Sequence, residues 1–233
     1  MSSRLAELHP RRFFLETWRG IDERARAARA AREEAGLGYD YRPLIVFCTG
    51  ALLLTAMEYC GMQEHFDALV LWMVELEIAG TVDGIFFTEL RHSEWYLLVA
   101  HAWWALWRVL GFLLLPMLII KLSKGKVSDQ YCSTRGFRDH LWIYLLAFAV
   151  VFACVIGVSF TEGFSTHYPF YEESHRSWFD LLTWELLYIL QFLGLEYFFR
   201  GWWLRSCESA LGSHAIFAMI APYVMIHFGK EWA

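Results

Sequence analysis

The sequence predicts an all-α, polytopic helical membrane protein with about five transmembrane helices and a cytoplasmic N-terminus. Hydrophobic residues make up 57% of the 233 residues, which is above the range typical of soluble domains. They come in long blocks rather than with the periodic spacing of amphipathic soluble helices. Loops rich in Lys and Arg alternate along the chain with loops poor in them, and this charge pattern indicates a multi-pass membrane protein.

The first 43 residues predict a basic helical arm ahead of the membrane domain. Nine Arg and no Lys interleave with seven acidic residues, and the Ala, Arg and Glu content favours a helix that ends at Gly36. Aromatic residues near its start suit a helix lying on an anionic membrane surface, and a solvated cytoplasmic helix fits equally well. The acidic residues argue against a nucleic-acid partner. We therefore expect a cytoplasmic or interfacial arm over 1–43 and a helical membrane domain over 44–233.

Five apolar runs are candidates for membrane spans. Three of them are separate, and the last two lie on either side of Gly212, a natural helix stop. In order, the runs cover 44–60, 95–120 and 141–160, and then the two halves of 178–230.

The loops between these runs predict the orientation in the membrane. Residues 61–94 hold seven acidic residues against Arg91 alone, and their apolar part is too short and too charged to cross, so we expect an interfacial or re-entrant piece. By the positive-inside rule, 61–94 and 161–177 lie outside, whereas 121–140 and the turn near Gly212 lie inside.

The second run carries charged and helix-bending residues. His101 and Arg108 are seven residues apart and share one helix face. We expect Arg108 to be a structural charge paired with a buried carboxylate such as Glu58, with a substrate role as the alternative. Pro116 predicts a kink.

The last two runs predict an antiparallel hairpin with an ionisable residue deep in each helix. Glu196 lies 16 residues before Gly212, and His227 lies 15 residues after it. At 1.5 Å per residue both sit ~23 Å from the turn, so they share one depth. Glu196 and Arg200 also form an i,i+4 pair in the favoured orientation.

A carboxylate and an imidazole facing each other inside a membrane are a functional-site hypothesis. Such a pair can activate water on a metal that the imidazole ligates, and it can also serve as a proton relay. It can equally be a polar clamp that holds two helices together. One Glu and one His do not complete a catalytic zinc site, which needs about three protein ligands.

Two stretches of the hairpin resemble the CPBP family of intramembrane metalloproteases, also called the CAAX protease or Abi family. LEYFFRG at 195–201 is similar to the family's Glu-Glu-x-x-x-Arg motif, and YVMIH at 223–227 is similar to its Phe-x-x-x-His motif. The likeness covers about residues 140–230. Leu195 and Tyr223 stand where the family has Glu and Phe. The third motif, a His with an Asn or Asp on a later helix, would fall beyond Ala233, so we expect a C-terminally shortened member.

The resemblance implies an intramembrane metal-dependent endopeptidase with Glu196, Arg200 and His227 as its catalytic residues. Glu196 and His227 would activate water for peptide hydrolysis and ligate a divalent metal, with zinc as the expected ion, while Arg200 would hold the Glu. The expected partners are a peptide or membrane-protein substrate and the lipid bilayer. The expected location is the cell membrane, the inner membrane in a bacterium. The alternative is a non-catalytic membrane protein that keeps the Glu/His hairpin for immunity, partner binding or proton relay.

Overall fold

The computed structural model describes residues 15–130, 137–168 and 170–228, and every regular element in these ranges is a helix. The all-α fold class is therefore confirmed. In chain order the elements are α2 (Thr17–Glu34), α3 (Arg42–Gly61), α4 (Gln63–Ile78), α5 (Phe86–His92), α6 (Tyr96–Val109), η2 (Leu110–Leu114), α7 (Leu115–Leu122), η3 (Val127–Asp129), α8 (Phe137–Val158), α9 (Glu162–His167), η4 (Glu172–His175), α10 (Trp178–Glu196), η5 (Tyr197–Trp203), α11 (Leu204–Leu211) and α12 (His214–Met225).

Four helical stretches of the described chain are long and apolar enough to cross a membrane, as a polytopic membrane protein requires. They are α3, α6 continued through α7, α8, and α10 continued through α11. The fifth expected span forms α12, which has only 12 residues. At 1.5 Å per residue it is about 18 Å long, whereas a span needs roughly 20 residues. The described residues thus hold four helices of spanning length, and the fifth expected run forms a shorter apolar helix.

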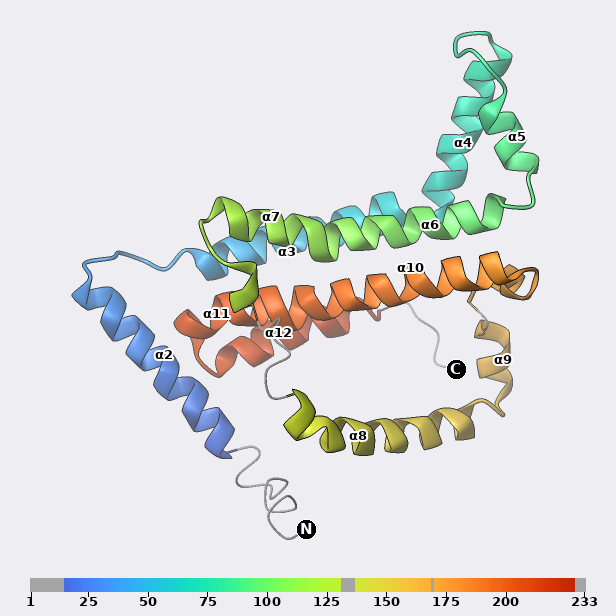
Figure 1. Ribbon diagram of the computed structural model, residues 1–233. Coiled ribbons are helices and arrows are strands. Elements are labelled where there is room, and N and C mark those ends of the chain that lie inside the picture. Colours follow the sequence, from blue (N-terminus) through green and yellow to red (C-terminus); the bar gives the residue numbers. More distant parts are fainter. Residues whose placement is uncertain (1–14, 131–136, 169, 229–233) are drawn as a thin grey trace.

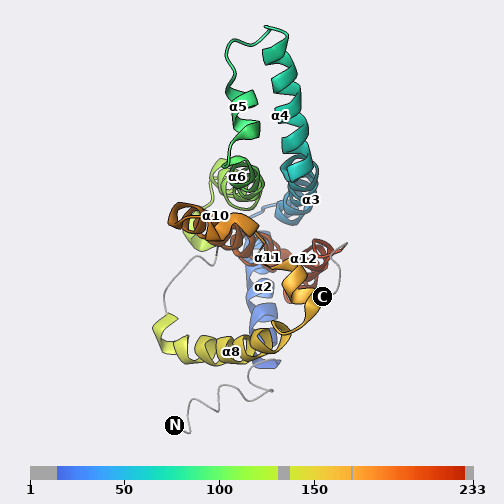
Figure 2. The same cartoon turned by 90° about the vertical axis from the view of Figure 1, so that its right-hand side faces the viewer.

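The spanning helices run alongside one another, and the acidic loop stands off them. In Figures 1 and 2, α3, α6 and α10 lie together, whereas α4 and α5 project away from their common end. Residues 61–94 thus lie across the direction of the spans, as the expected interfacial piece would. α8 lies apart from the other spans in both views, and none of its residues is buried.

The core of the fold surrounds η5. This π-helical segment directly continues α10 and carries six buried residues: Tyr197, Phe198, Phe199, Gly201, Trp202 and Trp203. Phe112 from η2 packs against it, with its ring centroid 5.2 Å from that of Phe198. α3 also packs closely against η5, because Gly50 has no side chain and lies against the ring of Trp203.

A second π-helical segment, η2, lies directly before Pro116, where the sequence predicts a kink. η2 ends at Leu114, and α7 follows with Pro116 at its N-terminal turn. Proline lacks the backbone N–H that would continue the helical hydrogen-bond ladder, so the preceding turn is the one that deforms.

The arm docks on the hairpin instead of standing free in solvent. α2 ends as predicted at Gly36, which has a φ of +64°. The carboxylate of Asp22 accepts a 2.8 Å hydrogen bond from the backbone N–H of Ser213, beside the hairpin turn. Arg24 pairs with Glu208 of α11 at 3.1 Å. Helix α2 is therefore tied to the end of the hairpin by polar contacts.

This docking predicts release of α2 in acid. The hydrogen bonds from Ser213 hold the pKa of Asp22 below its ordinary value of 3.8. A carboxyl with a lowered folded pKa contributes stability above its ordinary pKa and loses that contribution as the pH falls through the folded value. We expect hydrogen exchange in 17–34, corrected for intrinsic rates, to be faster at pH 3 than at pH 6. The variant Asp22→Asn should lose most of this pH dependence, and an unchanged dependence in that variant would contradict the assignment.

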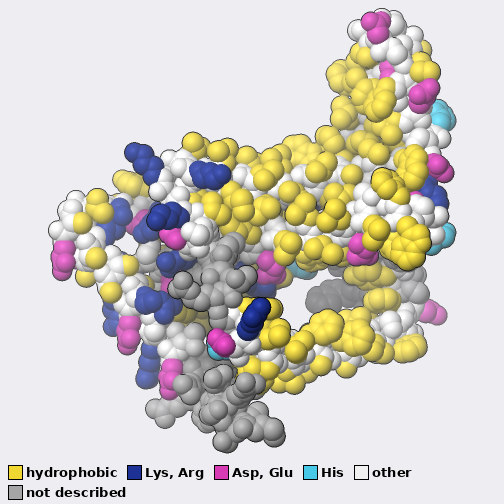
Figure 3. Space-filling model, viewed as in Figure 1, with side chains coloured by type: hydrophobic (Ala, Val, Ile, Leu, Met, Phe, Trp, Pro, Cys, Tyr) yellow, Lys and Arg dark blue, Asp and Glu magenta, His cyan; other side chains and the backbone are white. Residues whose placement is uncertain are grey.

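Charge is distributed unevenly over the molecule. In Figure 3, Lys and Arg side chains gather at the end where α2, α7 and α11 meet, and acidic side chains mark the outer end of the α4–α5 projection. This asymmetry agrees with the predicted orientation, in which the basic end faces the cytoplasm.

Candidate functional site

Glu196 and Arg200 lie at the junction between α10 and η5. The Arg200 guanidinium donates a hydrogen bond to the Glu196 carboxylate, so the expected i,i+4 pair is confirmed. The two side chains are 42% and 60% exposed, respectively, although the aromatic residues between them are buried. The pair therefore lies on the outer face of the helix, turned away from the η5 core.

A π-helical turn places this motif in an unusual backbone. π-Helical segments are rare and are frequent at functional sites, because an inserted residue shifts the side chains around the helix axis. Here the π segment runs from Tyr197 to Trp203 and includes Arg200. It turns the aromatic residues of the motif into the core while the ion pair stays outside.

His227 lies two residues beyond the end of α12 and is exposed. Its Nδ1 is 3.0 Å from the backbone oxygen of Tyr223. A carbonyl oxygen only accepts hydrogen bonds, so Nδ1 carries the proton and the neutral ring keeps its lone pair on Nε2. Nε2 is the nitrogen available for chemistry.

The hairpin brings the two motifs together. Its turn is at Gly212, as predicted, with a φ of +60° that favours glycine. Across the hairpin the ring of Phe199 meets that of Tyr223 edge-on, with centroids 5.1 Å apart. Glu196 lies three residues before Phe199, and His227 lies four residues after Tyr223, so each is about one turn beyond this contact. Both lie on the side away from Gly212.

The structure shows no direct contact between Glu196 and His227. In the described part of the chain the carboxylate is bonded to Arg200 and the imidazole to the Tyr223 carbonyl. A water or substrate that engages both must therefore lie between them.

The donor set does not fit the expected zinc centre. No group of three or more His, Cys, Asp or Glu side chains in residues 15–130, 137–168 and 170–228 is placed to hold a metal ion. Catalytic zinc takes about three protein ligands. Glu196 and His227 supply two, and Glu196 is already engaged by Arg200.

His101 is a core residue. Its Nδ1 lies 2.7 Å from the Leu97 carbonyl oxygen, and its Nε2 lies 3.3 Å from that of Phe170. Its ring also packs edge-on against Trp184 at 5.0 Å. These contacts tie α6 to α10 and leave the ring only 8% exposed.

Arg108 pairs with Glu58 as expected, at 3.9 Å. The Arg108 side chain is 18% exposed and that of Glu58 is 63% exposed. The pairing is therefore confirmed, whereas the prediction that the carboxylate is buried is wrong. The guanidinium also lies 5.0 Å from the centre of the Trp104 ring. These contacts indicate a structural charge.

Two concave sites were not predicted. An apolar groove of about 700 Å³ lies between α3 and α12, with Glu58 on one side and Met225, Ile226 and Phe228 beside His227. A second pocket, lined by basic and hydroxyl side chains, lies where α2, α3, α7 and α11 meet. In the sequence, nothing distinguishes the positively charged residues of this pocket from the other Lys and Arg residues outside the apolar runs. Only their position at the ends of apolar runs could have suggested that they lie close together.

No protein-family model, curated protein or solved structure matches the chain. The likeness to the CPBP family therefore rests on the two motifs and on the hairpin that carries them.

Proposed function

We propose that this chain is an intramembrane hydrolase of the CPBP type that cleaves peptide bonds in a peptide or membrane-protein substrate. The observation that carries the proposal is the Phe199–Tyr223 contact across the hairpin. It sets Glu196 and His227 at the same level of two antiparallel helices, on the same side of the contact. The protein would reside in the cell membrane, the inner membrane in a bacterium, with its N-terminus in the cytoplasm.

The residues present support a division of roles without a metal step. Glu196 acts as the general base that takes a proton from water, and the water oxygen attacks the peptide carbonyl carbon. Arg200 holds the carboxylate in place. Glu196 then passes that proton to the nitrogen of the leaving amine as the C–N bond breaks. His227, with its Nδ1 proton fixed on the Tyr223 carbonyl, accepts a hydrogen bond from the attacking water at Nε2.

The neighbouring groove supports a membrane-embedded substrate. It is lined mainly by apolar side chains from α3 and α12, and two of its lining residues, Ile226 and Phe228, flank His227 in the sequence. Its volume of about 700 Å³ suits a short stretch of extended apolar peptide.

The test is peptide cleavage by the full chain in proteoliposomes, with a library of quenched fluorescent apolar peptides. Glu196→Gln and His227→Ala should each lower the rate at least about 100-fold, the lower end for loss of a general acid or base. Glu185→Gln is the matched control, because Glu185 is an exposed carboxylate on the same helix, and it should keep the parent rate. No cleavage by the parent chain, or full activity in Glu196→Gln, would refute the hydrolase.

A non-catalytic membrane protein that uses the hairpin for partner binding is the second candidate. It is favoured by the ion pair itself, because Glu196 and Arg200 satisfy each other on an outer face. In that case the parent chain cleaves no peptide. Glu196→Gln would then leave the protein folded and would alter only the charge of that face.

A further inference from the structure

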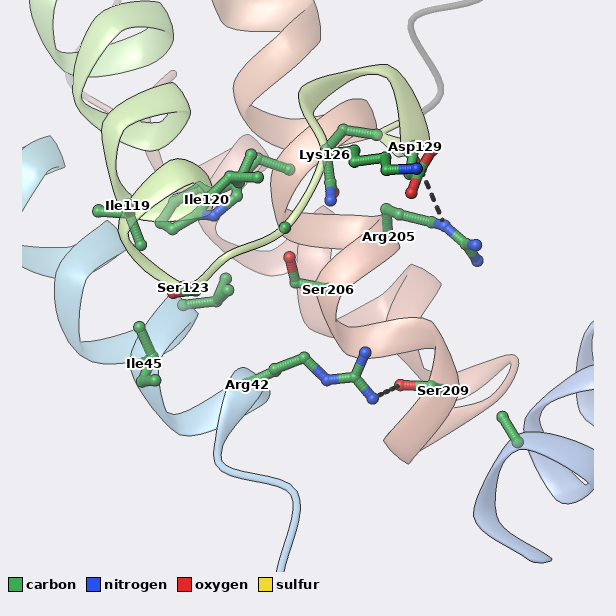
Figure 4. A pocket seen from close by; sticks show the side chains of 15 residues that line it. Arg42, Ile45, Ile119, Ile120, Ser123, Lys126, Asp129, Arg205, Ser206 and Ser209 are labelled. Atoms are coloured by element: carbon green, nitrogen blue, oxygen red, sulfur yellow. Dashed lines mark hydrogen bonds between the residues drawn. The ribbon is translucent and has the colours of Figure 1, made fainter. Parts of the chain in front are cut away.

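The pocket at the basic end of the spans combines three cations with an apolar wall (Figure 4). Its volume is about 460 Å³. Arg42 comes from the start of α3, Lys126 directly precedes η3, and Arg205 belongs to α11. Residues far apart in the sequence therefore bring positive charge to one cavity.

Two of the three cations of the pocket are paired with a neighbouring carboxylate. Arg42 is bonded to Asp40 at 2.6 Å and 2.8 Å and to the Ser209 hydroxyl at 2.8 Å. Arg205 donates to the backbone oxygen of Asp129 at 3.1 Å and to the Glu208 carboxylate at 3.2 Å.

Lys126 makes no ion pair with any residue that the structure describes. Asp129 is the one acidic residue of the pocket lining in that part of the chain, and its side chain takes a 3.3 Å hydrogen bond from Ser128. Because Asp40 and Glu208 offset the charges of Arg42 and Arg205, Lys126 is the cation through which the lining favours an anion.

The opposite wall is apolar. Ile45, Ile119 and Ile120 line it, and Figure 4 shows them on the side away from Lys126 and Arg205. α3 begins at Arg42 and α7 ends at Leu122, so the pocket lies at the ends of two spanning helices. This is the level at which the phosphates of a bilayer meet the acyl chains.

The pocket also offers an unsatisfied acceptor. The carboxamide oxygen of Gln130 is buried in the lining and takes no hydrogen bond from any described residue. A ligand with a hydroxyl group beside its phosphate would supply the missing donor.

We propose that this pocket binds the headgroup of an anionic glycerophospholipid, with phosphatidylglycerol as the best fit. The phosphate lies among Arg42, Lys126 and Arg205, whose guanidinium and ammonium groups are the usual phosphate donors. The headgroup hydroxyls reach Gln130, and the start of an acyl chain lies on the isoleucines. Basic pockets between spanning helices on the cytoplasmic side recognise lipid headgroups in this way. The proposal is independent of any hydrolase activity.

The test measures lipid binding by the purified full chain in neutral detergent, by native mass spectrometry and by thermal stability. The probes are dioctanoyl phosphatidylglycerol, dioctanoyl phosphatidylcholine and inorganic phosphate. We expect phosphatidylglycerol to bind with one-to-one stoichiometry and raise the unfolding midpoint, with little effect of the other two. Lys126→Gln should lower the affinity for phosphatidylglycerol about fivefold, which is the effect of removing one cation near an anionic headgroup.

Two further variants test whether binding depends on the pocket itself. Lys124→Gln is the matched control, because Lys124 is two residues away, is exposed and does not line the pocket, and it should leave the affinity within about twofold of the parent. Ser206→Asp adds a negative charge inside the pocket and should abolish binding. Equal binding of both lipids, or equal losses in the two Lys variants, would overturn the site. An equal shift with inorganic phosphate alone would overturn the lipid as its occupant.

Discussion

Asp180→Ala is expected to lower the free energy of unfolding by about 3 kcal/mol, the lower end for breaking a buried ion pair. Asp180 has no exposed surface. Its carboxylate accepts two hydrogen bonds from Arg176, at 2.6 Å and 3.1 Å, and one from the Tyr171 hydroxyl at 2.8 Å. Alanine would leave these donors unpaired at the point where η4 meets α10, which is why the effect should exceed that of a surface change.

The pKa values of the partners agree with this network. Desolvation and the hydrogen bond to Asp180 raise the pKa of Tyr171 to about 12. The same carboxylate raises the pKa of Arg176. Both partners thus stay protonated at neutral pH, and their donated hydrogen bonds are lost only when Asp180 is removed.

The measurement is the thermal unfolding midpoint of the full chain in detergent. At about 2–4 °C per kcal/mol for a chain of this size, Asp180→Ala should lower the unfolding midpoint by roughly 6–12 °C. Glu185→Ala, on the same helix but exposed, should fall by no more than about 2 °C. Equal shifts in the two variants would show that the network does not hold η4 to α10.

Features set by local composition could be predicted from the sequence. Four of the apolar blocks form helices that are long enough to span a membrane. Gly36 and Gly212 end their helices with a positive φ, as expected. The Glu196–Arg200 pair also follows from spacing alone, since residues four apart on a helix are neighbours.

Features that depend on contacts between residues far apart in the chain could not be predicted from the sequence. Nothing local distinguishes a docked arm from a free one, and the bond from Ser213 to Asp22 joins residues 191 apart. The π-helical η5 lies in a dense aromatic cluster, and Glu196, the residue directly before it, stays on the outer face. The short α12 was also hidden, because its apolar sequence runs on past the last helical residue.

The contact between α3 and η5 is the tightest of these distant features, and it predicts that Gly50→Leu destabilises the protein by about 3 kcal/mol, the upper end for overpacking. A Cβ at Gly50 would lie 2.2 Å from a ring carbon of Trp203. That ring is 2% exposed and is held in the η5 cluster, so it has no free space to enter. Better helix propensity of Leu offsets only about 1 kcal/mol of this cost.

Gly157→Leu in α8 is the matched control for this substitution. A Cβ there meets nothing within 4 Å, so only the gain in helix propensity acts, and the unfolding midpoint should stay or rise slightly. The double variant Gly50→Leu/Trp203→Leu should recover part of the loss, because a smaller side chain at 203 makes room for the added volume and the two sites share one space. Equal midpoints for Gly50→Leu and Gly157→Leu would show that α3 does not approach η5 this closely. The groove beside His227, which Trp203 helps to line, would then have a different shape.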